Sequence, residues 1–323
     1  MTPSKRVFVA ILGVGGVGRC FLAQLESLVK RRWNPELVLY YVASSKKAAY
    51  SDDWSGISVA NALSRLSKST QEPLGPSALA DRLKSAPSPV VLVDNTSSQD
   101  IADSYPIFLS RGVSIVTPNK KAFSGSWKLW QDIFAASAHS GALVYHEASV
   151  GAGLPVVSTL KDLLDTGDEV TKIEGVFSGT MSFLFNSFAP ISGSGGQWSA
   201  AVKEAKELGL AGLQVESPTS FPVQSLIPKE LETASNGDEF LQKLPQFDSQ
   251  MDDIKSGATK EGKAVRFVGS IDMTSKQVKV GLERFDRSHP IAALKGSDNI
   301  ISFYTKRIPR TLVQCHAVPR WLN

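Results

Sequence analysis

A glycine-rich loop near the start of the chain constrains its fold more than any other feature. Residues 6–12, RVFVAIL, form a largely apolar run with several β-branched residues, which is typical of a strand buried in a parallel sheet. Gly13, Gly15 and Gly18 follow in the spacing G-x-G-x-x-G, and residues 19–33 place apolar side chains on one face of a helix. This order of strand, loop and helix predicts an α/β domain with a dinucleotide site.

Each glycine of this loop has a separate expected role. Gly13 allows the tight turn, Gly15 lets a pyrophosphate approach the backbone, and Gly18 lets the helix pack closely on the strand. The unpaired N–H groups at the start of the helix would face the phosphates. A glycine-rich turn that holds no ligand is the alternative interpretation.

The second expected strand, residues 36–43, should lead to the residue that reads the adenosine ribose. NAD-binding sites usually place Asp or Glu there, but this strand continues into Ser44, Ser45, Lys46 and Lys47. Hydroxyls and lysines suit a 2′-phosphate, so the sequence favours NADP(H) over NAD(H). The alternative is that both lysines are solvated loop charges.

Two later strands also end in polar clusters. Residues 94–97 read DNTS and residues 117–121 read TPNKK, each directly after an apolar run. Ligands of open α/β sheets bind outside the carboxyl ends of the strands, where these clusters are expected. A lysine there can neutralise a carboxylate or transfer a proton, although polar loops at strand ends are also common without a site. His146 has apolar neighbours and is expected to be a core histidine.

Composition narrows the class of protein. The 323 residues suffice for two domains, and the net charge of +4 is spread along the chain, unlike the basic stripe of a nucleic-acid binder. No apolar run approaches the roughly 20 residues of a membrane helix. Cys20 and Cys315 give neither a disulfide framework nor metal-ligand spacing, and the N-terminus leads directly into a strand. We therefore expect a reduced, cytoplasmic protein with no nucleic-acid or membrane partner.

Seven segments together resemble homoserine dehydrogenase of the fungal, monofunctional type: GVGGVG, VDNTSS, TPNKKAF, YHEASVGAGLP, GDEVTKIEGVFSGTMSFLFN, VESPTSFPVQSLIP and SHPIAALKGSDN. The resemblance covers the chain from about residue 6 to about residue 307, and IEGVFSGTMSFLFN is its most specific part. It implies NAD(P)H-dependent interconversion of L-aspartate 4-semialdehyde and L-homoserine, in the biosynthesis of threonine, methionine and isoleucine. The implied fold is a Rossmann domain at 1–150 followed by an α/β catalytic and dimerisation domain at 151–307, with residues 308–323 as an atypical tail.

The resemblance also implies the roles of individual residues. Those expected to contact the coenzyme are Gly13, Val14, Gly15, Gly16, Val17, Gly18, Thr96 and Lys120. Lys120 is also the implied catalytic residue, one of two active-site lysines in the family. The residues implied for the substrate are Ser178, Gly179, Thr180 and Gly209. Those implied for a sodium ion, held largely by backbone oxygens, are Glu147, Val150, Ala152 and Leu154, although that glycine loop could equally be a hinge.

The chain departs from the family after Gly209. The family continues there through an acidic turn and a helix, roughly 25 residues that have no counterpart here. In the family, this segment supplies the second lysine and also the carboxylates that bind the substrate amine. Glu216 belongs to the strand that follows and is not expected to replace them. The glycine-rich tract at 191–197 adds slack but cannot replace a helix.

Two consequences are expected from these departures. The chain should be an impaired homoserine dehydrogenase; the alternative is a catalytically dead NADP(H)-binding subunit that pairs with a complete copy. The tail contains Pro309 and Pro319 and does not suit one helix. Residues 265–273 and 277–285 read as two strands of a sheet with one buried side. By resemblance that sheet helps to form a homodimer, whereas an ordinary domain core is the alternative.

Overall fold

The computed structural model describes residues 6–32, 34–151, 153–207, 224–307 and 313–317, the last of these for the backbone only. The chain divides into two compact units, Met1–Ala152 and Gly153–Asn323. Two of the expected site residues, Ala152 and Gly209, lie outside the described residues, as does Glu216. No helix of the described segments is long and apolar enough to cross a membrane.

The first unit contains a six-stranded sheet in the order β3-β2-β1-β4-β5-β6. All neighbouring strands run parallel except β2 and β3, which are antiparallel. The strands are β1 (Arg6–Leu12), β2 (Glu36–Ala43), β3 (Ala48–Ala49), β4 (Val90–Asp94), β5 (Ser114–Val116) and β6 (Val144–Tyr145). The Rossmann-type α/β fold expected from the glycine loop is therefore present.

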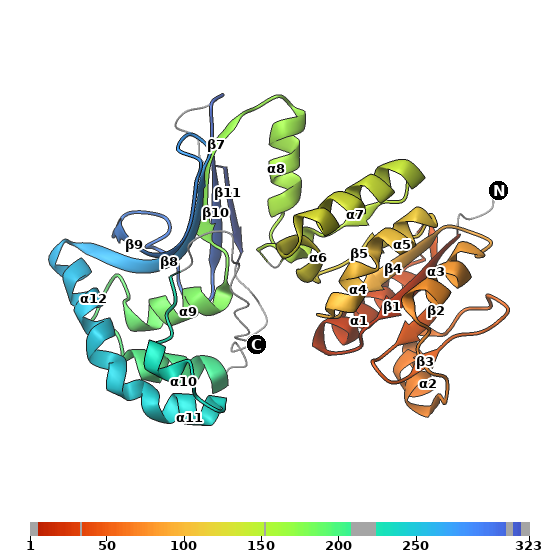
Figure 1. Ribbon diagram of the computed structural model, residues 1–323, viewed down its shortest axis with the longest axis horizontal. Coiled ribbons are helices and arrows are strands. Elements are labelled where there is room, and N and C mark those ends of the chain that lie inside the picture. The colour runs from red at the N-terminus through yellow and green to blue at the C-terminus, as the bar shows by residue number, and fades with distance from the viewer. Residues whose placement is uncertain (1–5, 33, 152, 208–223, 308–312, 318–323) are drawn as a thin grey trace. The chain divides into compact units, whose positions relative to one another are not determined.

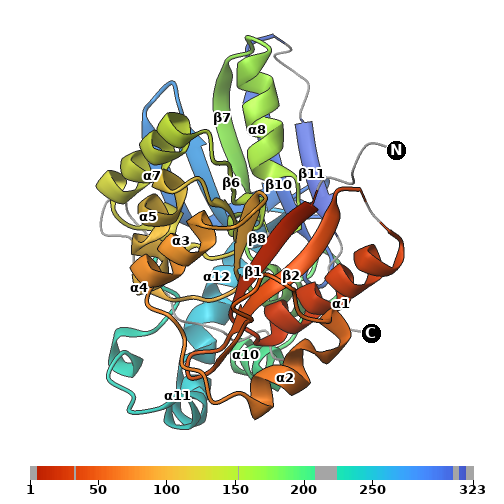
Figure 2. The ribbon, with the colours of Figure 1, turned by 90° about the vertical axis from the view of Figure 1, so that its right-hand side faces the viewer.

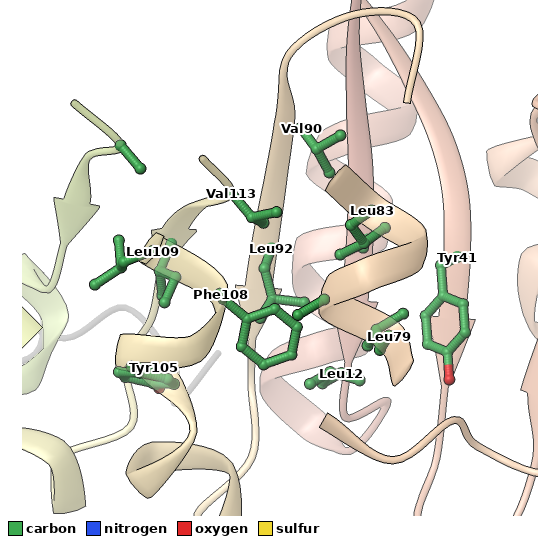
Figure 3. Close-up of a cluster of buried hydrophobic side chains, with 14 of the residues drawn as sticks. Leu12, Tyr41, Leu79, Leu83, Val90, Leu92, Tyr105, Phe108, Leu109 and Val113 are labelled. Carbon is green, nitrogen blue, oxygen red and sulfur yellow. The ribbon is translucent and has the colours of Figure 1, made fainter. Parts of the chain in front are cut away.

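Helices cover both faces of this sheet. They are α1 (Gly16–Lys30), α2 (Ala62–Lys68), α3 (Pro76–Lys84), α4 (Gln99–Asp103), α5 (Tyr105–Ser110), α6 (Lys121–Ser124) and α7 (Trp127–Ser140), with 3-10 turns η1 (Val59–Asn61) and η2 (Glu147–Ser149). Figure 2 shows α1 and α2 on one side of the strands and α3, α5 and α7 on the other. Leu22 and Leu25 of α1 pack in the cluster on the first side. Phe108 of α5 packs beside Leu92 of β4 in the cluster on the second (Figure 3).

The second unit contains a five-stranded antiparallel sheet in the order β11-β10-β7-β8-β9. Its strands are β7 (Val170–Val176), β8 (Lys263–Asp272), β9 (Gln277–Asp286), β10 (Asn299–Thr305) and β11 (Val313–Ala317). The hairpin expected at 265–285 is thus present as β8 and β9. In the tail after residue 307, residues 313–317 form a strand that pairs with β10 and extends the sheet, which agrees with the expectation that the tail is not one helix.

Helices α9, α10 and α12 of the second unit lie on one face of its sheet, whereas α8 lies apart from them (Figure 1). The helices are α8 (Val156–Asp165), α9 (Gly179–Phe188), α10 (Trp198–Glu207), α11 (Gly237–Lys243) and α12 (Asp248–Lys260), with 3-10 turns η3 (Lys229–Leu231) and η4 (Leu244–Phe247). Val265 and Phe267 of β8 and Leu282 of β9 pack in one cluster with residues of α9, α10 and α12. Lys279 of β9 is exposed and ion-paired with Glu283. One buried face and one more polar face agree with the alternation read from the sequence.

Candidate functional site

The glycine loop joins β1 to α1 by close backbone contacts. Gly13 has φ +87°, and a Cβ added there would lie 2.9 Å from Cγ2 of Thr96. A Cβ added to Gly18 would lie 2.1 Å from the carbonyl oxygen of Gly13, well inside contact distance. At Gly15 an added Cβ would meet nothing within 4 Å. Gly13 and Gly18 therefore allow the close contacts of the turn, and Gly15 leaves open space beside the backbone.

The start of α1 is suited to an anion. Gly15 is its N-cap and supplies no side-chain hydrogen bond, and the first turn contains no acidic residue. The first N–H groups of such a helix lack intrahelical acceptors and carry partial positive charge. These N–H groups, together with the open space at Gly15, form a suitable binding site for a pyrophosphate.

The loop after β2 holds its two lysines differently. The Ser44 hydroxyl accepts hydrogen bonds from the N–H groups of Lys46 (3.3 Å) and Lys47 (3.1 Å), which fixes a turn. Both lysines are exposed, but the Lys47 ammonium donates to the carbonyl oxygen of Ser67 at 2.7 Å, whereas the Lys46 ammonium has no hydrogen-bond partner among the described residues. Lys46 is therefore the better placed of the two to contact a 2′-phosphate.

A buried carboxylate connects the loops after β4 and β5. Asp94 is fully buried, and its Oδ1 accepts from the N–H of Thr96 at 2.8 Å. Its Oδ2 accepts from the Tyr105 hydroxyl at 2.6 Å and from Nδ2 of Asn119 at 3.1 Å. Burial, and then the negative charge of Asp94, raise the pKa of Tyr105, so this hydroxyl remains a donor at neutral pH. No local sequence pattern indicated Tyr105, because its contact with Asp94 depends on the packing of α5 on the sheet.

Lys120 lies directly after Asn119, at the start of α6. Its ammonium donates to the carbonyl oxygen of Ala148 at 3.4 Å, a long hydrogen bond. Although the residue as a whole is exposed, the protein around its ammonium lowers its pKa by desolvation. A lysine with a lowered pKa is more readily neutral and can exchange a proton near neutral pH.

The turn that receives Lys120 also contains two of the residues implied for sodium, Glu147 and, just after it, Val150. The carbonyl oxygen of Glu147 accepts from the N–H of Val150 at 3.4 Å, and that of Leu154, in the second unit, accepts from Val156 at 2.9 Å. A carbonyl oxygen has two lone pairs, so each retains capacity for a cation. Among the described residues, no group of three or more His, Cys, Asp and Glu side chains is arranged to hold a metal ion.

His146 packs against aromatic side chains, as expected for a core histidine. Its ring stacks on Phe123 with a centroid separation of 4.1 Å, and Nδ1 lies 3.3 Å from the hydroxyl of Ser149. Burial lowers the pKa of His146. The ring is therefore neutral near pH 7 and supports the turn that contains Ala148.

Three of the four residues implied for the substrate lie together at the start of α9. Ser178 is the N-cap, and its hydroxyl accepts from the N–H of Met181 at 3.3 Å. Gly179 and Thr180 follow in the first turn. A Cβ added to Gly179 would lie 3.2 Å from the carbonyl oxygen of Ser297, so this glycine allows α9 to approach the segment before β10.

A second contact joins α9 to the same segment. Nδ2 of Asn186 donates to the carbonyl oxygen of Gly296 at 3.0 Å. Gly296 and Ser297 belong to SHPIAALKGSDN, which carried the resemblance but had no role assigned. This segment is held against α9 by a contact between residues more than 100 positions apart in the sequence, which local sequence patterns do not reveal.

Comparison with known proteins agrees with these two units. Residues 13–147 match the family model for the NAD-binding domain of homoserine dehydrogenase, and residues 155–317 match the model for homoserine dehydrogenase itself. The chain belongs to the homoserine dehydrogenase family. The family match ends ten residues beyond position 307, where we had placed the limit of the resemblance, and so includes β11.

Fungal homoserine dehydrogenases are among its relatives. The enzyme of Emericella nidulans is 50% identical over 94% of this chain and 91% of its own length. The enzyme of Saccharomyces cerevisiae is 44% identical over 96% of this chain and 92% of its own. These identities support the monofunctional fungal type.

Solved structures show the same fold. A Candida auris protein of unknown function has a TM-score of 0.88 and 42% identity, covering 97% of this chain and 93% of its own. A hyperthermophilic archaeal homoserine dehydrogenase in complex with NADPH has a TM-score of 0.66 at 18% identity, covering 97% of this chain and 91% of its own. This second likeness concerns the fold alone.

The length of one alignment bears on the expectation that a family segment is absent after Gly209. The alignment with the Emericella homoserine dehydrogenase extends over 337 residues, more than the 323 of this chain, although it covers only 94% of it. The relative therefore contains residues with no counterpart here. The alignment is longer than this chain, as expected if the relative has an internal segment that this chain lacks.

Proposed function

We propose that this homoserine dehydrogenase retains a complete coenzyme site and works slowly on its substrate. On this proposal it interconverts L-aspartate 4-semialdehyde and L-homoserine with NADP(H), at a turnover well below that of its longer fungal relatives. The observation that carries the proposal is the combination of an open, acid-free glycine loop with Lys120 next to the Asp94 contacts. The nicotinamide coenzyme, when bound, supplies or accepts the hydride.

Lys120 has two tasks in this proposal. In the oxidation of homoserine, its neutral amine accepts the proton that leaves the substrate hydroxyl. In the reverse direction, its ammonium donates a proton to the oxygen that forms the hydroxyl. The lowered pKa of Lys120 supports both tasks, because it brings the neutral and charged forms closer in population near neutral pH. Thr96 and Asn119, fixed by Asp94, keep the flanking loops in place.

The substrate side is expected to limit the rate. Ser178, Gly179 and Thr180 offer polar groups and close backbone approach, but they supply neither a carboxylate for the substrate amine nor a second lysine. A positioned acid or base contributes about 10²- to 10⁴-fold in rate. Without the missing segment, orientation of the substrate is also weakened.

Four further features belong to the same proposal. The exposed Lys46 favours NADP(H) over NAD(H). A sodium ion bound by the carbonyl oxygens of Glu147, Val150, Ala152 and Leu154 would brace the turn next to Lys120. The enzyme forms a homodimer through its second unit. The cytoplasm is the expected compartment, supported by the sparse, unpatterned cysteines.

The decisive experiment measures NADPH oxidation with L-aspartate 4-semialdehyde and, separately, NADPH binding by fluorescence titration. The Emericella enzyme serves as the reference. Slow turnover with intact NADPH binding supports the proposal, and turnover equal to the reference contradicts the expected impairment. Binding with no turnover at all would favour the alternative of a coenzyme-binding subunit that pairs with a complete copy.

A further inference from the structure

A basic pocket in the second unit lies apart from the residues discussed so far. It has a volume of about 380 Å³ and is formed by the end of α9, the loop that follows it, the last turns of α12, the start of β8 and the turn after β9. Figure 1 shows α12 leading directly into β8. The ten residues of α9 span about 15 Å, so the pocket is separated by the length of this helix from Ser178 at its other end.

Four cationic side chains line this pocket: Lys255, Lys260, Lys263 and Arg287. Two of them have acidic partners, since Lys255 pairs with Asp252 at 2.9 Å and Lys263 pairs loosely with Glu261 at 3.6 Å. Within the described ranges, Lys260 and Arg287 have no carboxylate within ion-pair distance. The pocket therefore has an excess of positive charge.

A fifth cation lies beneath the pocket wall. Arg266 is 1% exposed, and its guanidinium donates to the carbonyl oxygens of Ala189 (2.8 Å), Val265 (2.8 Å) and Ala292 (2.6 Å). Ala189 and Val265 themselves line the pocket. Its Nε is buried without a hydrogen-bond partner, and no carboxylate among the described residues neutralises it. Burial lowers the pKa of Arg266 to about 10, so it stays charged at neutral pH.

Part of the glycine-rich tract at 191–197 lines the pocket, and the tract packs against the end of α9. The N–H of Gly196 donates to the carbonyl oxygen of Ser187 at 3.1 Å. A Cβ added to Gly195 would lie 2.1 Å from the carbonyl oxygen of Phe188, so the loop packs closely on the end of α9. Gly193 and Ser194 of this loop line the pocket, as do the hydroxyl-bearing Ser256 and Thr259 of α12.

We propose that this pocket binds a phosphate group, either as inorganic phosphate or as part of a small phosphate ester. Excess positive charge, hydroxyl donors and a glycine loop are the groups that recognise phosphate oxygens. The buried charge of Arg266 strengthens the attraction, because it lies under the pocket wall and is weakly screened by solvent. The proposal is independent of the dehydrogenase activity and concerns a site without a role in that reaction.

The test uses the full chain and isothermal titration with inorganic phosphate and, in a second arm, with glycerol 2-phosphate, at constant ionic strength. We expect saturable binding, weakened about tenfold or more in the double variant Lys260→Gln/Arg287→Gln, which removes the two unpaired charges. Lys276→Gln is the matched control, because Lys276 is exposed at the other end of the β8–β9 hairpin. Tighter binding of the ester than of phosphate would identify an ester as the ligand, and the reverse would identify phosphate.

The variant Gly15→Val separates this pocket from the coenzyme loop, which could also bind phosphate. Binding that persists in Gly15→Val and is lost in the double variant supports the proposal. Binding that disappears in Gly15→Val but not in the double variant overturns it, as does the absence of saturable binding. If the double variant does not fold, each single variant is expected to weaken binding at least threefold, and unchanged affinity in both overturns the proposal.

Discussion

The loops of the first unit and the start of α9 in the second unit are both fixed by close contacts, yet they differ in what those contacts provide. In the first unit, Gly13, Gly18 and Asp94 shape a site whose expected recognition of coenzyme depends mainly on backbone groups. In the second unit, Ser178 and Gly179 position a helix. By the family resemblance, the side chains expected to act on the substrate belong to a segment that we infer this chain to lack. We therefore expect backbone recognition of the coenzyme to be retained and side-chain chemistry on the substrate to be weakened, because the absence of a segment in the second unit would not alter β1 and α1.

The largest effects are expected from substitutions in the glycine loop. Two of them should separate an effect on NADPH binding from an effect on the stability of the fold. Gly15→Val should abolish NADPH binding with little change in the free energy of unfolding, because the added side chain enters open space that the pyrophosphate needs. Gly18→Ala should instead destabilise the first unit, because its Cβ would lie 2.1 Å from the oxygen of Gly13. Fluorescence titration and urea unfolding measure the two effects. Unchanged NADPH affinity in Gly15→Val would rule out this loop as the coenzyme site.

The next largest effect concerns Lys120. Lys120→Arg should reduce turnover by about 10²- to 10⁴-fold, because a guanidinium keeps the charge but cannot accept a proton near neutral pH. NADPH affinity should change much less.

The pH dependence of the unmodified chain provides a second measurement of this role. The pKa of Lys120 is lowered, so homoserine oxidation should rise with pH as the amine loses its proton and level off below the pH expected for an ordinary lysine. Semialdehyde reduction should fall over the same range. A pH profile that Lys120→Arg leaves unchanged would show that another group carries the proton.

A smaller effect is expected from restoring the missing segment. Insertion after Gly209 of an acidic turn and helix of the kind that the family resemblance implies should raise turnover at least about 10²-fold, by the contribution of a positioned acid or base. The coenzyme affinity should stay the same, since the first unit is not altered. An insertion of equal length with its carboxylates and lysine changed to Gln is the control. Equal turnover with and without the insertion would mean that the catalytic groups lie elsewhere, with Glu216 and Lys229 the first to test.

The smallest effect concerns coenzyme preference. Lys46→Gln should weaken NADPH binding by about tenfold or less, because an exposed charge contributes little in water, and should leave NADH binding unchanged. Lys47→Gln is the comparison, since Lys47 is already bonded to the carbonyl oxygen of Ser67. Equal loss of affinity for both coenzymes in Lys46→Gln would argue against a contact with the 2′-phosphate.

Local patterns predicted the fold well. Residues 6–12 form β1 as expected, the glycine loop leads into α1, and the hairpin at 265–285 is present, because alternation and glycine spacing act over a few residues. The contact of Tyr105 with Asp94 and that of Asn186 with Gly296 could not be predicted, because each depends on the packing of a helix on a distant segment. The prolines of the tail correctly argued against a helix, but nothing local indicated pairing of residues 313–317 with β10.

The bonds of Asp94 have a consequence for how the first unit can evolve. One carboxylate binds the Thr96 backbone, the Tyr105 hydroxyl and the Asn119 amide, so three segments share a single acceptor. Replacing Tyr105 or Asn119 removes a side-chain donor and leaves the other bonded to a carboxylate whose environment has changed, so the effects of the two replacements should not add. The loops after β4 and β5 are therefore not free to diverge separately. The effect of a substitution in one of them should depend on the residues present in the other.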